Sequence, residues 1–180
     1  MILTDREIRD IPYLITPFTE QVKEKGFTRG LSPCGYDLAL GNKFIKYHGY
    51  TVDPTKKFAD GQYVVSDFSN NPKIDYYILG SCDFVLGQSV EYIKMPTNLH
   101  GMCHLKSTWV RTGLMMSPTL IQPGWEGYLT FEFVNGTRNP ITLHFGVGIV
   151  HLSFTRINEP GKSYSGIYQN QASVTPPKTD

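Results

Sequence analysis

The chain has 180 residues, of which 40% are hydrophobic and 18% charged, and its 17 Lys+Arg against 16 Asp+Glu give a net charge of +1. A chain of this length forms one domain, and the composition is typical of a folded soluble protein. The small net charge disfavours a nucleic acid held mainly through its phosphates, and no apolar run approaches the roughly 20 residues that span a bilayer. We therefore expect neither a nucleic-acid partner nor a membrane.

The first residues lack the basic start and apolar core of a signal peptide. The three cysteines form no CxxC motif and are odd in number, which makes a disulfide framework improbable. Both observations favour the reducing cytoplasm as the location of the protein.

Two stretches are predicted to be helical, and the remaining signals are those of strands. The first helix covers residues 4–11, where Thr4 and Glu7 have the spacing of a capping box, and the second covers residues 106–112, ended by Gly113. β-branched and aromatic runs predict strands at residues 37–47, 76–86, 127–134, 141–145 and 148–154. We therefore expect a mostly β sandwich or barrel with one or two short helices. The polar composition of residues 163–180 predicts a mobile arm.

A protein-bound metal is poorly supported by the sequence. The five histidines are scattered, and although His100 and His104 are four residues apart, they form no HExxH motif and Gly101 disfavours a helix between them. The HxE…PCxxC pattern of zinc-dependent nucleobase deaminases is absent, as are the P-loop, GxGxxG and GxSxG motifs. We therefore predict no metal site built from protein side chains.

Residues 106–111, KSTWVR, combine two cations and two hydroxyls in one predicted helical turn. Ser107 and Arg111 are four residues apart and share a face, while Lys106, Ser107 and Thr108 lie where free backbone N–H groups favour an anion. This pattern is compatible with a phosphate cradle. The alternative is an ordinary basic turn in contact with solvent.

A second informative segment is residues 125–133, WEGYLTFEF. Strand periodicity puts Leu129, Phe131 and Phe133 on one face, and places Thr130 and Glu132 on the other. A carboxylate in so aromatic a strand loses part of its hydration, which raises its pKa toward the range of a general acid/base. The alternative is an outward-facing Glu132 on a half-exposed strand.

These segments, in this order and spacing, resemble the dCTP deaminase family of the trimeric dUTPase-like superfamily. The similarity extends over nearly the whole chain and includes LTDREI at 3–8, GYDL at 35–38, SVEYIKMP at 89–96, KSTWVRTGL at 106–114, PGWEGYLTFEF at 123–133 and YQNQ at 168–171. The resemblance implies a distorted β-barrel or jelly-roll subunit of the dUTPase-like type over residues 1–160, assembled as a homotrimer with active sites between subunits. Residues 161–180 would form a tail that closes over the nucleotide.

The resemblance also implies the activity, the zinc-independent hydrolysis of dCTP or a close relative to dUTP and ammonia. Glu132 would be the catalytic acid/base, with Ser107 and Arg111 placing and polarising the water, and Mg²⁺ would accompany the triphosphate. The implied contacts to the deoxycytidine nucleotide come from Lys106, Ser107, Thr108, Arg111, Thr130, Phe131, Tyr164 and Gln171.

Four positions depart from the family pattern and imply altered substrate recognition. Leu105 stands where a glycine is usual, Ala39 replaces a frequent arginine, Ile167 occupies the place of a tail lysine, and Val150 stands where Gln or Gly is common. Two alternatives stay open, a dUTPase-like diphosphatase or bifunctional enzyme and a non-catalytic nucleotide-binding regulator. The first is disfavoured because Gln122 stands where that chemistry uses an aspartate.

Overall fold

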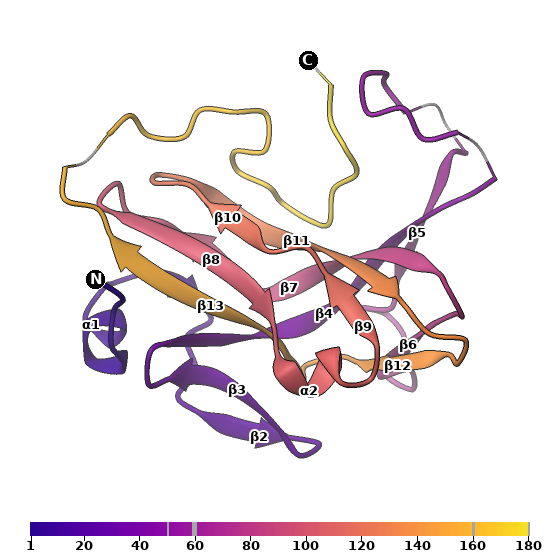
Figure 1. Ribbon diagram of the computed structural model, residues 1–180, viewed down its shortest axis with the longest axis horizontal. Helices are drawn as coiled ribbons and strands as arrows, with labels where there is room; N and C mark the ends of the chain where they lie inside the picture. The colour runs from indigo at the N-terminus through magenta and orange to yellow at the C-terminus, as the bar shows by residue number, and fades with distance from the viewer. Residues whose placement is uncertain (50, 59–60, 160, 180) are drawn as a thin grey trace.

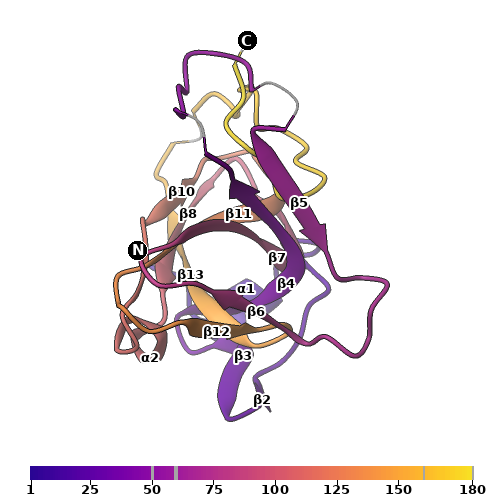
Figure 2. The same cartoon turned by 90° about the vertical axis from the view of Figure 1, so that its right-hand side faces the viewer.

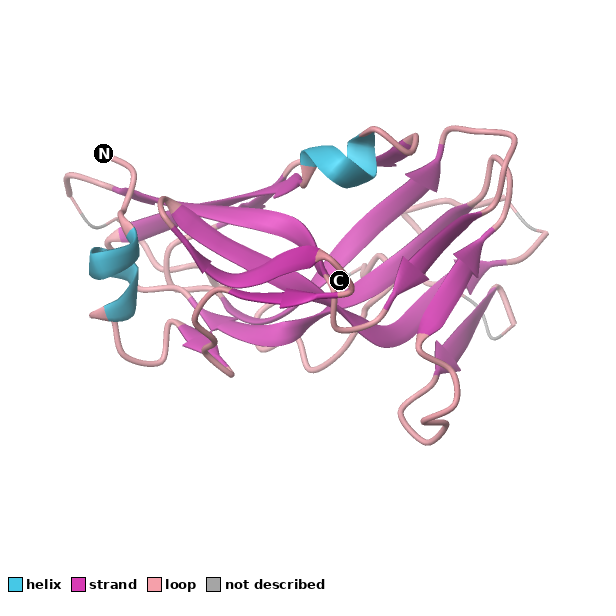
Figure 3. Ribbon diagram, turned by 90° about the horizontal axis from the view of Figure 1, so that it is seen from below, coloured by secondary structure: helices cyan, strands magenta, loops and turns pink. Residues whose placement is uncertain are grey.

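The computed structural model describes residues 1–49, 51–58, 61–159 and 161–179. Within these residues it is mostly β, as Figure 3 shows, and the secondary structure includes two short helices. The helices are α1 (Asp5–Arg9) and α2 (Ser107–Val110). The strands are β1 (Ile15–Thr16), β2 (Val22–Glu24), β3 (Phe27–Ser32), β4 (Gly35–Tyr47), β5 (Tyr63–Asp67), β6 (Tyr76–Leu79), β7 (Phe84–Lys94), β8 (Leu99–Leu105), β9 (Leu114–Met116), β10 (Thr119–Ile121), β11 (Glu126–Asn135), β12 (Ile141–His144) and β13 (Gly148–Arg156).

The strands form one large curled sheet and one small sheet. The large sheet has the order β10-β8-β13-β4-β7-β11-β9, with β1 beside β7 and with β5 and the β2-β3 pair beside β4, and β6 pairs with β12 separately. Every pairing is antiparallel. Seen end-on, the strands lie round a ring (Figure 2). The barrel-like, mostly β architecture predicted from the sequence is therefore confirmed.

The core of the barrel is filled by alternate residues of the long strands. On β11 the odd-numbered residues are buried and the even-numbered residues half-buried, so Leu129, Phe131 and Phe133 share one face as their spacing predicts, and this face is the buried one. Tyr36 and Phe154 from the neighbouring part of the sheet are likewise fully buried. This packing orients the other face of β11, which carries Thr130 and Glu132, away from the core.

The N-terminal helix forms where its capping box predicts it. The backbone N–H of Thr4 donates to the Glu7 carboxylate at 2.9 Å, and α1 follows from Asp5. Neither described helix is long and apolar enough to cross a membrane.

Two predictions need correction. The strand expected over residues 76–86 is two strands, because the chain turns at residues 80–83, where Cys82 has a φ of 53° and Asp83 N–H donates to Gly80 O at 3.3 Å. The tail, predicted on composition to be a mobile arm, packs against the sheet: Tyr128 N–H donates to Gln171 O at 2.8 Å, and Gly127 and Gln171 form a parallel bridge. Pro160 and Asp180, which bound the expected tail, lie outside the described residues.

Candidate active site

A cavity of about 550 Å³ lies between β10, β11 and the C-terminal tail. Its size is in the range of small-molecule sites. The lining residues are mostly aromatic or aliphatic, with a few polar groups among them: Tyr47, Val52, Phe84, Leu86, Thr119, Leu120, Ile121, Gln122, Trp125, Leu129, Thr130, Glu132, Tyr164, Tyr168, Gln171, Thr175, Pro176 and Pro177.

Glu132 supplies the carboxylate of this cavity. The alternation of β11 turns its side chain away from the core, and the residue is half-buried. Burial raises the pKa of the Glu132 carboxyl above its usual range, and hydrogen bonds from its own backbone N–H and from the Thr119 hydroxyl offset only part of this effect. The Thr119 contact, at 3.5 Å, is long and therefore weak. A carboxyl whose pKa is raised suits general acid/base chemistry better than an ordinary solvent-exposed carboxyl.

The tail covers the cavity and is fixed by side-chain amides. Gln171 Nε2 donates to Tyr128 O at 2.8 Å and to Thr130 Oγ1 at 2.7 Å, which places its amide group against the strand that carries Glu132. Trp125 Nε1 donates to Tyr168 O at 2.8 Å. The yellow tail lies across β10 and β11 at the top of Figure 1. A covered cavity of this kind limits access of bulk water to the carboxylate.

Four residues singled out in the sequence therefore meet at one place, namely Thr130, Glu132, Tyr164 and Gln171. Phe131 lies between Thr130 and Glu132 on the same strand, but its side chain is fully buried in the core. Only the backbone of Phe131 remains for a ligand on the cavity side of β11.

The other predicted group, on the turn at residues 106–113, lies elsewhere in the chain. None of Lys106, Ser107, Thr108 and Arg111 is among the described residues that line the cavity, and the last three are exposed. Figures 1 and 2 show α2 on the opposite side of the barrel from the tail. Within a single subunit, the Ser107 and Arg111 side chains therefore do not meet the Glu132 carboxylate.

The α2 helix is shorter than its sequence pattern predicts. It covers four residues, Ser107–Val110, and the turn that follows it closes at Gly113, which has a φ of 86°. So short a helix has little macrodipole, so the hydroxyls and Arg111 are the main anion-binding groups that the turn exposes.

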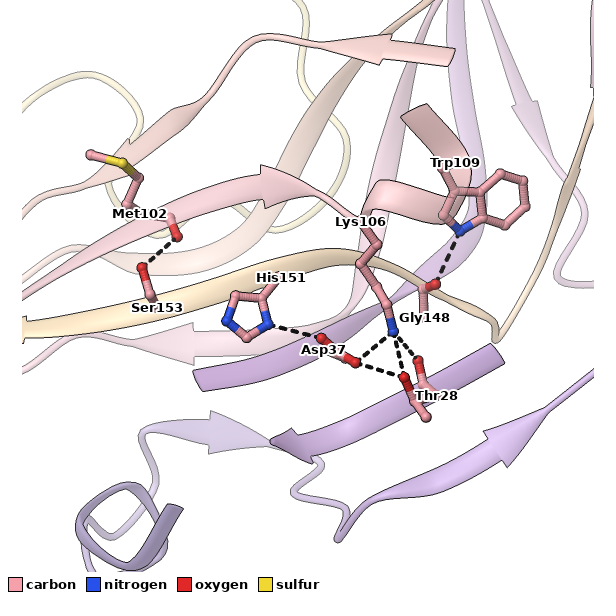
Figure 4. Close-up of polar contacts among 8 residues, drawn as sticks. All are labelled: Thr28, Asp37, Met102, Lys106, Trp109, Gly148, His151 and Ser153. Carbon is pink, nitrogen blue, oxygen red and sulfur yellow. Dashed lines mark hydrogen bonds and ion pairs between the residues drawn. The ribbon is translucent and has the colours of Figure 1, made fainter. Parts of the chain in front are cut away.

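Lys106 points inward from this turn. Its Nζ lies 2.5 Å from Asp37 Oδ2, 2.6 Å from Thr28 O and 2.7 Å from Thr28 Oγ1 (Figure 4). The contact of Lys106 with phosphate that we expected stays a prediction, and in this structure its ammonium group is bound within the subunit.

The structure also shows the surroundings of the residues that depart from the family pattern. Leu105 is half-buried against the core and lies opposite Val150 in the sheet. The Ala39 backbone N–H donates to the buried carboxylate of Glu91 at 3.0 Å. Ile167 is 41% exposed in the tail.

Sequence reasoning missed two residues beside the cavity. Lys178 Nζ donates to Ile167 O at 3.2 Å and lies 5.7 Å from the centre of the Tyr168 ring, so the tail carries a cation next to the place of the missing lysine. Tyr47 lines the cavity from β4, and burial, with the Tyr168 and Glu132 charges nearby, raises the pKa of its phenol to about 12. No signal in the local sequence indicated either residue, because both reach the cavity through long-range packing.

Four of the five histidines lie on strands, and His48 directly follows β4. His100 and His104 are both on β8, and His104 is paired with His151 across the sheet. No group of three or more His, Cys, Asp or Glu residues that could hold a metal ion occurs in the part of the chain that the structure describes.

A half-buried carboxylate with a raised pKa in a cavity of this size is the arrangement of an enzyme that moves protons, and comparison with solved structures shows a related fold. The fold is similar to that of the 2'-deoxycytidine 5'-triphosphate deaminase of Agrobacterium tumefaciens, with a TM-score of 0.63 and 18% identity over 85% of this chain. The likeness covers 47% of that longer chain and shows the fold.

The family itself is shown by sequence. A family model described as dCTP deaminase-like matches residues 2–157, and the chain belongs to this family. The dCTP deaminase of Acidobacterium capsulatum is 34% identical, with 98% of both chains covered. The dCTP deaminase of Azotobacter vinelandii is 35% identical, with 92% of this chain and 91% of the relative covered. The dCTP deaminase of Helicobacter pylori strain P12 is 34% identical over 92% of this chain and 89% of the relative.

Proposed function

We propose that this protein is an enzyme that hydrolyses dCTP to dUTP and ammonia. The observation that carries the proposal is the half-buried Glu132 carboxylate, with its raised pKa, in a cavity covered by the tail. Relatives of nearly equal length that carry the name dCTP deaminase support the same reaction.

The chemistry assigned to Glu132 is proton transfer. Water adds to C4 of cytosine while Glu132 takes a proton from the water and delivers it to N3. Glu132 then moves a proton from the new hydroxyl to the amino group, the C4–N4 bond breaks, and ammonia leaves with the carbonyl of uracil formed. The carboxylate must be ionised to start this sequence, so protonation of Glu132 at low pH stops it.

Ser107 and Arg111 complete the site from a second copy of the chain. Both are exposed on the α2 turn, away from the cavity of their own subunit, so they reach a Glu132 carboxylate only across an interface. Arg111 would stabilise the developing negative charge and Ser107 would hold the water. We assign the protein a homotrimeric assembly on this ground and on the resemblance of the family. In a cyclic trimer every subunit supplies Glu132 to one active site and Ser107 and Arg111 to another.

The tail and the turn divide the remaining contacts. Gln171 and Tyr164, with Thr130 and the backbone of Phe131, face the nucleoside, while Ser107 and Thr108 face the phosphates. Mg²⁺ arrives bound to the triphosphate and neutralises part of its charge. Deoxynucleotide metabolism and the three free thiols, Cys34, Cys82 and Cys103, support a cytoplasmic location.

The experiment is a substrate panel on the wild-type protein and on Glu132→Gln. The panel contains dCTP, dCMP, 5-methyl-dCTP and dUTP with Mg²⁺, and products are separated by chromatography. We expect dUTP and ammonia from dCTP, with a rate that falls at low pH as Glu132 is protonated. In Glu132→Gln the reaction should be lost and dCTP binding kept, because the amide preserves the shape but cannot take a proton.

Each other outcome identifies a different function. Diphosphate released from dUTP indicates a diphosphatase, and binding without any product indicates a regulator. Appreciable ammonia release by Glu132→Gln would show that another group is the base. Glu159→Gln, at an exposed position outside the cavity, is the matched control.

A further inference from the structure

Beneath the α2 turn lies a compact network of four side chains, which Figure 4 shows in close-up. The ammonium group of Lys106 donates to three acceptors, namely Thr28 O, Thr28 Oγ1 and Asp37 Oδ2, at 2.6, 2.7 and 2.5 Å. The side chains of Lys106 and Asp37 are only 15% and 8% exposed. An ammonium group has no fourth proton to offer, so its donor capacity is used within the subunit.

Asp37 is held by the same network from its other side. Its Oδ1 lies 2.9 Å from His151 Nδ1, and the Thr28 hydroxyl donates to Oδ2 at 3.0 Å. Burial alone would raise the pKa of Asp37, but hydrogen bonds from His151, Lys106 and Thr28 together with the Lys106 charge hold it below its usual range. Asp37 is therefore ionised. If Lys106 turned outward, it would leave a buried carboxylate without its cation, which is costly.

The network is joined directly to the turn that carries Ser107 and Arg111. Lys106 is the residue immediately before α2, and its backbone N–H donates to Ile149 O at 3.0 Å. One turn later, Trp109 Nε1 donates to Gly148 O at 3.1 Å, and its ring stacks on Phe27 at 4.9 Å.

The close approach of two backbones makes this anchoring possible. A Cβ on Gly148 would lie 1.9 Å from Thr28 O, so only glycine allows β13 to come this close to β3. The turn is thereby fixed from below at Lys106 and at Trp109, while Ser107 and Arg111 stay exposed above.

We propose that Lys106 is a positioning residue: paired with Asp37 inside its own subunit, it holds Ser107 and Arg111 in place for the reaction and does not bind the triphosphate. The proposal rests on the proposed function and concerns the same site. On this proposal, Asp37, Thr28 and His151 support the turn through Lys106 and do not contact the substrate. It leaves Ser107, Thr108 and Arg111 as the groups on this turn that meet the substrate.

Asp37→Asn separates a positioning role from a phosphate-binding role because the two predict opposite results. If Lys106 positions the turn, Asp37→Asn and Lys106→Gln both lower kcat, on the order of tenfold, and the double variant is no worse than either single variant. If Lys106 binds phosphate, Lys106→Gln raises KM for dCTP with little change in kcat. Asp37→Asn then leaves KM for dCTP unchanged or lowers it, because it releases the ammonium group.

The measurements are kcat and KM for dCTP and for dCMP in all variants. A positioning role predicts the same fall in kcat with both nucleotides, and Lys106→Arg should restore most of it because a guanidinium still pairs with Asp37. A KM effect confined to dCTP would overturn the proposal. Lys25→Gln is the matched control, since Lys25 contacts Asp75 and His144 in a similar Lys–Asp–His group far from the turn in sequence.

Amide hydrogen exchange tests the proposal independently of catalysis. The N–H groups of Arg111, Thr112 and Gly113 are bonded within the turn at 3.0, 3.0 and 2.9 Å. Lys106→Gln and Asp37→Asn should speed their exchange, and unchanged exchange in both variants would overturn the proposal even if the wild-type protein proved inactive. Inactive wild-type protein with faster exchange in the variants would instead refute only the deaminase. If Asp37→Asn does not fold, Thr28→Val removes one acceptor without stranding a charge and should show the same changes to a smaller degree.

Discussion

Glu91 is a buried carboxyl outside the proposed site, and its replacement by glutamine should stabilise the protein at alkaline pH. The residue is 1% exposed, and its Oε2 accepts the Ala39 backbone N–H at 3.0 Å. Burial raises the pKa of Glu91 to about 7, and hydrogen bonds from Ala39 N–H and its own N–H, with the Arg29 charge, oppose only part of that rise. Glutamine keeps the acceptor and the shape but has no proton to lose.

The size and direction of the effect follow from the two pKa values. Glu91 in the unfolded chain has the ordinary pKa of 4.5, against about 7 in the fold. Between these values the folded state keeps a proton that the unfolded state releases, so stability falls as pH rises from about 4.5 to about 7 and is level above. The full loss corresponds to about 3 kcal/mol.

Urea unfolding of the wild type and of Glu91→Gln at pH 5 and pH 8, at one protein concentration, measures this contribution. The difference between the two proteins should shift by about 2.5 kcal/mol in favour of the glutamine variant between the two pH values, because part of the full loss has already occurred at pH 5, while other titrating groups cancel. Glu159→Gln, at an exposed position, should show no such shift. A difference between wild type and Glu91→Gln that stays constant with pH would refute the reasoning.

Two further predictions concern the subunit interface and the tail. Mixing inactive Glu132→Ala with inactive Arg111→Ala should restore roughly a quarter of wild-type activity if the two residues meet across subunits that exchange at random. If mass spectrometry shows mixed trimers but no activity returns, both residues act within one chain. Lys178→Met should raise KM for dCTP more than for dCMP because it removes a cation beside Tyr168. Lys162→Met, at an exposed position earlier in the tail, should not have this effect. If the two variants have the same KM for dCTP, Lys178 does not belong to the site.

The strands that the sequence predicts well are those with a local pattern. β11 alternates between buried and half-buried residues along its whole length, and Leu129, Phe131 and Phe133 were placed together on one face on that basis. The break between β6 and β7 was missed because it depends on Cys82 in a positive-φ conformation, which no residue preference at that position indicates.

The parts of the site that the sequence could not predict are held by distant partners. Polar composition made the tail look mobile, but Gln171 finds acceptors on β11, 41 and 43 residues away. In the same way, nothing in the basic turn indicated that the Lys106 ammonium group pairs with Asp37, which lies 69 residues earlier in the chain. A local pattern identifies the residue types at such places, and only the tertiary structure decides what each one contacts.

The inward position of Lys106 has a consequence for the phosphate end of the substrate. With Lys106 paired to Asp37 and with isoleucine at 167, we expect Arg111 of the α2 turn and Lys178 of the tail to be the main cations at a bound triphosphate. A triphosphate carries more negative charge than two side chains neutralise, so in the proposed complex Mg²⁺ bound to the nucleotide would supply the remainder. On the proposed function, we therefore expect selection of dCTP over dCMP to depend less on a dedicated lysine than on the metal that the triphosphate itself carries.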